Sequence, residues 1–399
     1  MSIQVNNSEV KSGWTTVKFG DVVKNANLAE RDPEAAGIER IVGLEHLDPK
    51  NLHIRRWNTL ENDTSFTRKF VPGQTLFGKR RAYQRKVAFA EFEGICSGDI
   101  LTFEPKDPDV LLPELLPFIC QTDAFFDHAL GTSAGSLSPR TSYKTLQNFE
   151  FPLPPFEEQK RIAEILWASD EAVEKYLRAR ERLTFLKSQV LREQLANNSA
   201  NTVPCAELFE RPPRNGYSPK TNASGEGSRT LSIGAVRDGS VNPEGNTKYA
   251  DISAADLEKF ELSTGDVLIV RGNGNKNLCG KAGLVSSIPS GYFYPDLLIR
   301  LSFDENKILP EFAVEQWNEP KTHSRLLPVA KSTNGIWKIN GKDLKQHTLD
   351  ILPIEVQQGI VTRLNNLKSL DTETSAHIDR LRNLRTTLSN CIFEASKDV

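Results

Sequence analysis

Residues 151–166 read FPLPPFEEQKRIAEIL, and they predict the start of a long helix. Pro154 and Pro155 suit a helix start, and the acidic residues Glu157 and Glu158 favour the positive end of its dipole. From Ile162 onward, apolar or small residues recur at alternating spacings of three and four. They are Ile162, Ile165, Ser169, Ala172, Tyr176, Ala179, Leu183, Leu186 and Val190. A stop at residues 197–199 leaves about 40 helical residues, or roughly 60 Å of helix.

A second long helix is predicted from Glu355 toward the C-terminus. Its apolar positions are Val361, Leu364, Leu367, Leu370, Ile378, Leu381, Leu384, Leu388 and Ile392. The polar run DTETS at residues 371–375 interrupts this pattern. Two such helices, separated by a globular segment, can pair antiparallel and bury both apolar seams. The alternative is that each helix packs only on its own domain.

The chain contains two similar halves, because short landmarks recur in the same order. The separation is 186 positions between Phe19 and Cys205 and reaches 199 positions between Leu153 and Leu352. Other recurring segments are 72–76 with 264–268, 99–101 with 296–298, and 112–114 with 309–311. Each landmark is short, but their shared order favours a diverged internal duplication.

Short apolar runs between glycines and charged turns precede each helix, and they are typical of strands. The runs are 75–77, 87–90 and 100–103 in the first half, and 266–270, 282–285 and 297–301 in the second. We therefore predict an α/β (α+β) fold with two pseudo-repeated globular domains and two long helices that pair as an antiparallel coiled coil. The predicted segments are 1–155 (first domain), 156–200 (first helix), 201–354 (second domain) and 355–399 (second helix).

The composition is that of a globular protein with more than one core: 399 residues, 38% hydrophobic and 26% charged. The sequence has neither an uninterrupted apolar window long enough for a membrane span nor an apolar signal segment, so we expect a cytoplasmic protein. Five scattered cysteines and six histidines without HExxH spacing predict neither a disulfide framework nor a metal site. A net charge of −2 excludes a generally basic surface but allows a local basic groove.

Signals for catalysis are weak. The GxxxxGK[ST] phosphate loop is absent, and no GxGxxG opens a helix. One pattern resembles a nuclease, since Asp296 is followed by Glu305 and Lys307, and carboxylates with a nearby lysine can hold Mg²⁺ at a phosphodiester. A Mg-dependent nuclease is therefore an alternative function.

Local charge patterns favour nucleic-acid binding. Cations bind phosphate, arginine can fork onto guanine, and Asn or Gln can pair with adenine. The candidate DNA contacts after the strand at 75–77 are Lys79, Arg80, Arg81, Tyr83, Gln84, Arg85 and Lys86. At the matching place in the second half they are Arg271, Asn273, Asn275, Lys276 and Lys281. A solvated turn is the alternative for either loop.

A second pair of loops, rich in small polar residues, precedes each long helix. The candidate contacts are Ser133, Ser136 and Arg140 in the first half, and Ser332, Asn334 and Lys338 in the second. Small polar residues with a cation suit phosphate or base-edge contacts, but they also suit an ordinary turn.

Residues 151–166 also resemble the hallmark of a protein family, the specificity subunits of type I restriction-modification systems. The hallmark is a Pro-Pro pair that opens a helix, followed by Glu-Gln-x-x-Ile, here ending in Glu158, Gln159 and Ile162. The second copy, residues 352–361, is degenerate: Ile354 replaces the second proline and Gln357 replaces the glutamate. Residues 14–22, WTTVKFGDV, resemble the family's domain opening, and the resemblance covers essentially the whole chain through order and length.

The resemblance implies two target recognition domains, each reading one half of a bipartite DNA site, and a coiled-coil spacer on which two methyltransferase subunits dock. This chain would be non-catalytic and would bind no cofactor. S-adenosylmethionine, ATP and Mg²⁺ would belong to the partner subunits of a complex that methylates adenine N6 and restricts DNA. Because the two predicted recognition domains differ in sequence, we expect an asymmetric DNA site with an unread gap of several base pairs between its halves. A coiled-coil scaffold that binds only protein is the other alternative.

Overall fold

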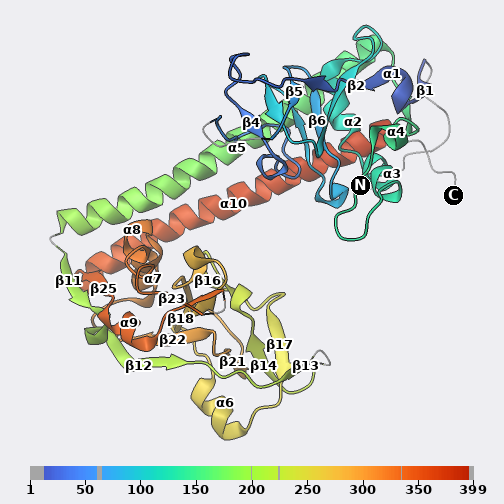
Figure 1. Cartoon of the computed structure of the whole chain (residues 1–399). Helices are drawn as coiled ribbons and strands as arrows, with labels where there is room; N and C mark the ends of the chain where they lie inside the picture. Colours follow the sequence, from blue (N-terminus) through green and yellow to red (C-terminus); the bar gives the residue numbers. More distant parts are fainter. Residues whose placement is uncertain (1–12, 61–64, 199, 223–224, 334, 395–399) are drawn as a thin grey trace, which may run out of the picture. The chain divides into compact units, whose positions relative to one another are not determined.

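The computed structural model describes residues 13–60, 65–198, 200–222, 225–333 and 335–394 (Figure 1). The chain divides into two compact units, residues 1–180 with 373–399, and residues 181–372. The long helices α5 (Phe156–Asn197) and α10 (Ile354–Phe393) contribute to both units. Within the described residues, no helix is both long and apolar enough to cross a membrane.

The described part of the first unit is a mixed α/β head built before α5. Its main sheet has the order β2-β9-β6-β7, a smaller sheet has the order β3-β5-β8-β4, and β1 pairs with β10. The elements are β1 Thr15–Lys18, α1 Phe19–Val22, β2 Val23–Asn25, β3 Leu28–Ala29, β4 Ile41–Val42, η1 Leu44–His46, β5 Arg68–Phe70, β6 Thr75–Gly78, η2 Ala82–Gln84, β7 Val87–Phe89, β8 Gly94–Cys96, β9 Ile100–Pro105, η3 Pro113–Leu115, α2 Leu116–Ile119, α3 Asp123–Gly131, α4 Tyr143–Leu146 and β10 Glu150–Leu153.

The described part of the second unit is the corresponding head between α5 and α10. Its sheets have the orders β12-β22-β18-β20-β16-β15, β13-β17-β14-β21, β19-β24-β23 and β11-β25. The elements are β11 Asn201–Pro204, η4 Cys205–Glu207, β12 Phe209–Asn215, β13 Thr221–Asn222, β14 Ser228–Leu231, η5 Ile233–Ala235, β15 Val236–Arg237, β16 Gly239–Val241, β17 Thr247–Ala250, α6 Ala254–Phe260, β18 Val267–Val270, β19 Gly272–Asn273, η6 Lys276–Leu278, β20 Ala282–Leu284, β21 Tyr292–Phe293, β22 Leu298–Phe303, α7 Pro310–Asn318, α8 Pro320–His323, β23 Lys331–Thr333, β24 Ile336–Lys338, α9 Gly341–Gln346 and β25 Thr348–Ile351.

The main sheets of the two heads repeat one topology. The antiparallel strands β9-β6-β7 of the first unit correspond to β22-β18-β20 of the second. The start of each head is also tied to its end in the same way, because Phe19 N donates to Phe149 O and Cys205 N donates to His347 O, both at 2.7 Å. The smaller sheets have diverged in strand order. The shared topology supports the predicted duplication.

One glutamine near the start of each long helix repeats a set of hydrogen bonds. Gln159 Oε1 accepts from Leu112 N, and Gln357 Oε1 accepts from Leu309 N, each at 2.9 Å. Both Nε2 groups donate to two backbone carbonyls. Gln357 is therefore the counterpart of Gln159, and the alignment that placed it at the glutamate of the hallmark was wrong. Val356 stands at that position, because the offset between Gln159 and Gln357 is 198 positions, one less than the 199 positions between Leu153 and Leu352.

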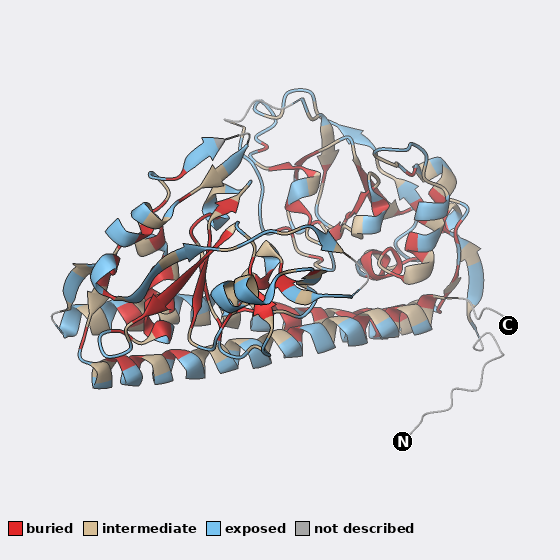
Figure 2. Cartoon of the chain, turned by 90° about the horizontal axis from the view of Figure 1, so that it is seen from below, coloured by how far each residue is buried: buried red, intermediate tan, exposed pale blue. Residues whose placement is uncertain are grey.

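In each unit, segments of the two long helices run antiparallel. In the first unit Asp170 of α5 forms a buried ion pair with Arg385 of α10, and Phe393 shares an apolar core with Ile162. In the second unit, Leu191 of α5 shares a core with Leu364 of α10. Figure 2 shows buried residues on one side of the long helices and exposed residues on the other. The predicted antiparallel pairing is confirmed.

The predicted seam of α5 had the wrong phase. Ile165 and Leu186, both assigned to the seam, are 61% and 44% exposed. The buried positions instead include Leu166, Val173 and the acidic Asp170. Counting only apolar residues missed this phase, because a charged side chain with a buried partner can occupy a seam.

Candidate nucleic-acid interface

In the first unit, the cationic segment after β6 is a tight turn. Gln84 N donates to Arg81 O at 2.9 Å and Arg85 N donates to Ala82 O at 2.8 Å, which forms η2. Arg81 and Arg85, on either side of η2, both have a φ of 53°. This left-handed conformation is uncommon for residues other than glycine, and such strain is concentrated at functional segments. The turn is therefore a candidate functional segment on geometry as well as charge.

The two loops predicted to contact DNA in this unit lie against each other. Arg80 and Arg140 form an isolated antiparallel bridge, and Arg81 N donates to Pro139 O at 2.8 Å. The guanidinium of Arg80 donates to Ser138 Oγ at 3.1 Å. Segments far apart in the sequence thus form one surface, in which the arginines of the first loop meet the small polar residues of the second.

Asp99, in the turn immediately before β9, contacts two arginines of this surface. Its carboxylate accepts from Arg140 Nε at 2.8 Å and from Arg80 Nη1 at 3.4 Å. The hydrogen bond from Arg140, and the charges of Arg140, Arg80 and Lys79, hold the pKa of Asp99 below its usual value. Burial and the charge of Arg68 lower the pKa of Lys79. The carboxylate orients Arg140 and Arg80, and with Lys79 nearby the surface keeps an excess of positive charge. Sequence reasoning did not select Asp99 as a DNA-site residue.

The other predicted residues of the first unit differ in accessibility. Tyr83 and Ser136 are exposed, and Gln84 is half-buried. Ser133 Oγ donates to Ala129 O at 2.7 Å, which ties it to the end of α3. Their assignment as DNA contacts stays a prediction.

Two predicted contacts are held by other parts of the first unit. The guanidinium of Arg85 pairs with Asp123 and lies 4.7 Å from the ring centroid of Phe126. The ammonium of Lys86 donates to Leu44 O at 2.6 Å. Arg85 and Lys86 are half-buried, whereas Arg81 and Arg140 are exposed even with their partners Ser138 and Asp99. Arg81 and Arg140 are therefore the stronger candidates for DNA contact.

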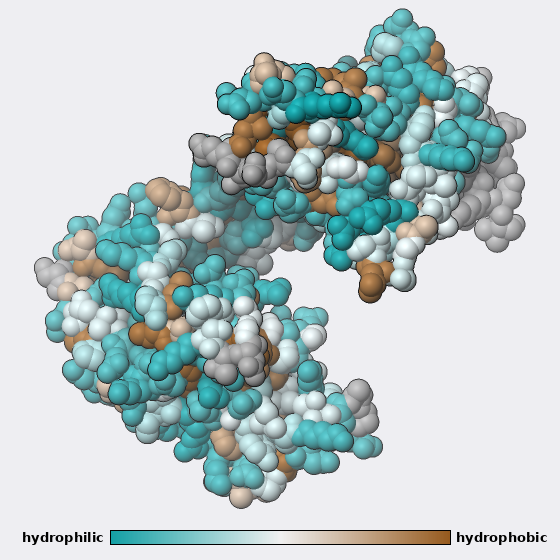
Figure 3. Space-filling model, viewed as in Figure 1, coloured by the Kyte–Doolittle hydropathy of each residue, from teal (hydrophilic) through white to brown (hydrophobic). Residues whose placement is uncertain are grey.

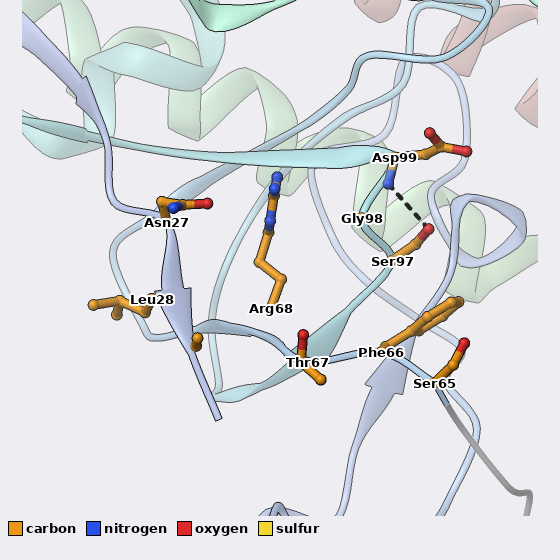
Figure 4. A pocket seen from close by; sticks show the side chains of 10 residues that line it. Asn27, Leu28, Ser65, Phe66, Thr67, Arg68, Ser97, Gly98 and Asp99 are labelled. Carbon is orange, nitrogen blue, oxygen red and sulfur yellow. Dashed lines mark hydrogen bonds between the residues drawn. The ribbon is translucent and has the colours of Figure 1, made fainter. Parts of the chain in front are cut away.

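A hollow of about 410 Å³ borders the cationic surface through Asp99. Figure 4 shows Arg68 between Asn27 on one side and the turn Ser97–Asp99 on the other. The Arg68 side chain donates to Ile100 O. Asp99 N donates to Ser97 Oγ at 3.2 Å, which shapes the turn. The hollow extends the polar surface beside the loops.

The second unit brings its two predicted loops together in a small sheet. β19 pairs with β24, with Gly272 opposite Lys338 and Asn273 opposite Trp337, and β24 pairs with β23. The ammonium of Lys276 lies 4.4 Å from the ring centroid of Trp337, a cation–π geometry. As in the first unit, the loop after the central strand meets the loop before the long helix.

Asparagine side chains shape the first of these loops. Asn273 Oδ1 accepts from Asn275 N at 2.8 Å, and Asn275 Oδ1 accepts from Asn277 N at 3.0 Å. These Asx turns fix the loop through side-chain oxygens. The loop is therefore built around asparagines where the first unit has arginines.

The remaining predicted residues of the second unit have mixed surroundings. Arg271 Nη1 donates to Asp296 O at 3.0 Å. Lys281 is half-buried, and burial lowers its pKa. Ser332 is exposed and Lys338 half-buried, whereas Asn334 lies outside the described residues.

The structure does not bring together the three residues of the nuclease pattern, Asp296, Glu305 and Lys307. Asp296 precedes β22 and accepts from Ser218 Oγ at 2.6 Å. Glu305 and Lys307 follow β22, so the full length of that strand separates them from Asp296. Lys307 instead donates to Glu207 O at 3.1 Å. In the part of the chain that the structure describes, no group of three or more His, Cys, Asp or Glu is arranged to hold a metal.

Comparisons with known proteins agree with this geometry. Residues 11–180 match the family model described as the type I restriction modification DNA specificity domain. The specificity subunit of the type I restriction enzyme EcoKI from Escherichia coli (strain K12) is 26% identical over 306 residues. That match covers 70% of this chain and 66% of the EcoKI subunit, slightly less than two thirds of the relative's length.

Two solved structures share the fold across the chain. One, from work on complex assembly and conformational transition of the type I R-M system, has a TM-score of 0.55 at 18% identity and covers 96% of this chain and 98% of its own. The type I restriction-modification S subunit from M. genitalium has a TM-score of 0.54 at 14% identity, with 99% of each chain covered. Residues 11–180 thus match a type I restriction modification DNA specificity domain, and the whole chain shares the fold of such subunits, which confirms the resemblance found at residues 151–166.

Proposed function

We propose that this chain is the non-catalytic subunit that gives a type I restriction-modification complex its DNA specificity. The observation that carries the proposal is the repeated interface: each unit joins two polar loops at the same place in a duplicated fold. Two unlike copies of one surface suit a bipartite, asymmetric site, with one half read by each unit.

The chemistry of the two surfaces supports different half-sites. In the first unit the exposed Arg81 and Arg140 suit phosphate contacts and bidentate contacts to guanine. In the second, the amides of Asn273 and Asn275 suit adenine, and Lys276 suits phosphate. The chain's net charge of −2 favours modest affinity alone and tighter binding within a complex.

In this proposal the long helices dock two methyltransferase subunits. These partners bind S-adenosylmethionine and methylate adenine N6 on a base turned out of the stack, and motor and nuclease subunits bring ATP and Mg²⁺. Apolar side chains exposed on α5 support a protein contact there, because Ile165 is 61% exposed in the first unit and Phe185 is 60% exposed in the second. The complex would act on DNA in the cytoplasm.

The test is to co-purify the chain with its cognate methyltransferase subunits and to map methylated adenines in host DNA. We expect one asymmetric motif of two halves with a fixed gap. Arg81→Ala should weaken recognition of the first half, and Asn273→Ala that of the second, each by roughly tenfold. Lys106→Ala, an exposed cation beside an acidic loop, is the control and should change neither half.

Two outcomes would contradict the proposal. A stable, S-adenosylmethionine-loaded complex that leaves adenines unmethylated would argue against a specificity role. Failure to form any complex with the methyltransferase subunits would argue against the proposed docking on α5 and α10.

A further inference from the structure

Leu137 stands out among the apolar side chains of the first unit, because it is 92% exposed. It lies in the loop between α3 and α4, which projects from the body of this unit (Figure 1). On the face drawn in Figure 3, apolar residues form separate spots in a mainly hydrophilic surface, and one spot lies where this loop ends. A single exposed leucine is ordinary on a protein surface, so a binding role for Leu137 has to follow from what surrounds it.

The loop that presents Leu137 is held in place. Ala134 and Arg140 exchange two backbone hydrogen bonds, at 3.0 and 2.9 Å, which close the loop into a hairpin around Leu137. Arg80 and Arg81 both donate to the hydroxyl of Ser138, the next residue, at 3.1 and 3.4 Å. Leu137 therefore lies next in sequence to a residue that binds two guanidinium groups, on a loop that hydrogen bonds hold in place.

The second unit offers a partial counterpart. Gly135 and Gly335 both have positive φ, 105° and 77°, and each lies in the loop that precedes the long helix. Ile336, which follows Gly335, is 36% exposed. Both heads thus place an aliphatic side chain just after the glycine of this loop, beside cations.

We infer that Leu137 packs directly against DNA bases of the first half-site, which rests on the proposed function. When Arg80, Arg81 and Arg140 approach phosphates, the projecting loop brings Leu137 to the groove between the strands. There an aliphatic side chain covers thymine methyl groups or an opened base step. Because cations lie beside Leu137, we expect its binding partner to be DNA rather than a protein surface. Val110, a comparable exposed apolar residue of the same unit, instead has Asp107 and Asp109 beside it.

The contact has a measurable signature. A side chain that neutralises phosphate releases counterions, so its loss lowers the salt dependence of binding and weakens every DNA equally. A leucine against bases releases no counterion. Its loss should weaken binding only to the recognised sequence and leave the salt dependence unchanged.

The experiment measures binding of the purified complex with its methyltransferase subunits to two duplexes, over a range of salt concentrations. One duplex carries the site found by methylation mapping, and the other is a random sequence of the same length. Leu137→Ser should weaken binding to the site about tenfold, with unchanged binding to random DNA and an unchanged salt slope. Arg81→Ala should weaken binding to both duplexes, with the greater loss on the site, and should lower the slope by about one. Val110→Ser is the matched control and should behave like the wild type.

Three results would overturn the inference: wild-type affinity of Leu137→Ser for the site, equal loss on both duplexes, or weaker assembly of this variant with the methyltransferase subunits. The last would make Leu137 a protein contact. If the wild-type complex itself does not prefer the mapped site to random DNA, the proposed function fails instead. Equal thermal unfolding midpoints of Leu137→Ser and wild type establish that the variant is folded, which its exposure predicts.

Discussion

Gln357 and Gln159 use both ends of their amide groups, which no carboxylate can do. In the second unit Gln357 is fully buried, accepts from Leu309 N, and donates to the carbonyls of Lys307 and Leu352 at 3.0 and 2.7 Å. This one side chain fastens the segment before α7 to the start of α10. The glutamine of the family hallmark thus has a structural role. Its neutral amide pairs with one backbone N–H donor and two backbone carbonyl acceptors at once.

We predict that Gln357→Glu destabilises the second unit by about 3 kcal/mol. The new carboxylate would face two carbonyl oxygens in a buried place, while its size stays the same. Gln358→Glu, at the exposed neighbouring position, is the control and should change stability by less than about 0.5 kcal/mol. Urea unfolding of the two variants and the wild type measures the difference. Equal midpoints for the two substitutions would show that the hydrogen bonds of Gln357 contribute little.

At the scale of elements, a polar cluster joins the paired helices of the first unit to its head. Asp170 of α5 and Arg385 of α10 are each 2% exposed and form an ion pair. Arg385 also donates to Lys50 O at 2.9 Å, and His53 Nε2 lies 2.8 Å from Asp170 Oδ2. Burial lowers the pKa of Arg385 to about 10, so it stays charged at neutral pH. The cluster fixes the phase of the helices against the loop that carries Lys50 and His53.

Removing one partner of this ion pair should lower the free energy of unfolding. Arg385→Met leaves Asp170 buried without its main counter-charge, and we expect a loss of about 3–5 kcal/mol. Arg380→Met, an exposed arginine on the same helix, should be nearly neutral. The double variant Asp170→Leu/Arg385→Met should recover much of the loss, because it leaves no unpaired buried charge. Thermal unfolding in a calorimeter tests this order, and a double variant no more stable than Arg385→Met alone would contradict it.

At the scale of the whole molecule, we propose that the two long helices act as the spacer that the family resemblance implies, so that helix length determines the gap in the DNA site. The rings of Tyr176 and His377 lie 5.3 Å apart, which gives a matched point on the two helices. Inserting seven residues after Tyr176 and seven before His377 keeps the seam phase nearly unchanged and adds about 10 Å. We expect the unread gap to lengthen by about three base pairs, as read from the methylated motif, with both half-sites unchanged.

The control for this prediction is the insertion in α5 alone, which breaks the register of the helix pair. It should abolish methylation or destabilise the protein rather than lengthen the gap. An unchanged gap in the double-insertion variant, with full methylation, would show that the helices do not set the spacing.

Local patterns were sufficient for the elements and the repeat. The Pro-Pro pair and the acids after it predicted the start of α5, and short apolar runs predicted β6, β7, β9 and their counterparts. These signals could be read because helix starts and strands depend on residues only a few positions apart. The one-residue error at Gln357 arose where the sequences of the two copies have diverged. There the matching hydrogen bonds, rather than residue identity, show that Gln357 is equivalent to Gln159.

The sequence by itself determined the resemblance to type I specificity subunits, the two long helices, the central strands of each head and the positions of the cationic and asparagine-rich loops. Only the tertiary structure decided which helix face is buried, that Asp99 orients the arginines of two separate loops, that Arg85 and Lys86 are engaged elsewhere, and that Leu137 is exposed. The physical reason is the range of the interactions. Periodicity and capping act over a few residues, whereas burial, ion pairing and loop-to-loop contacts join residues that the sequence keeps far apart.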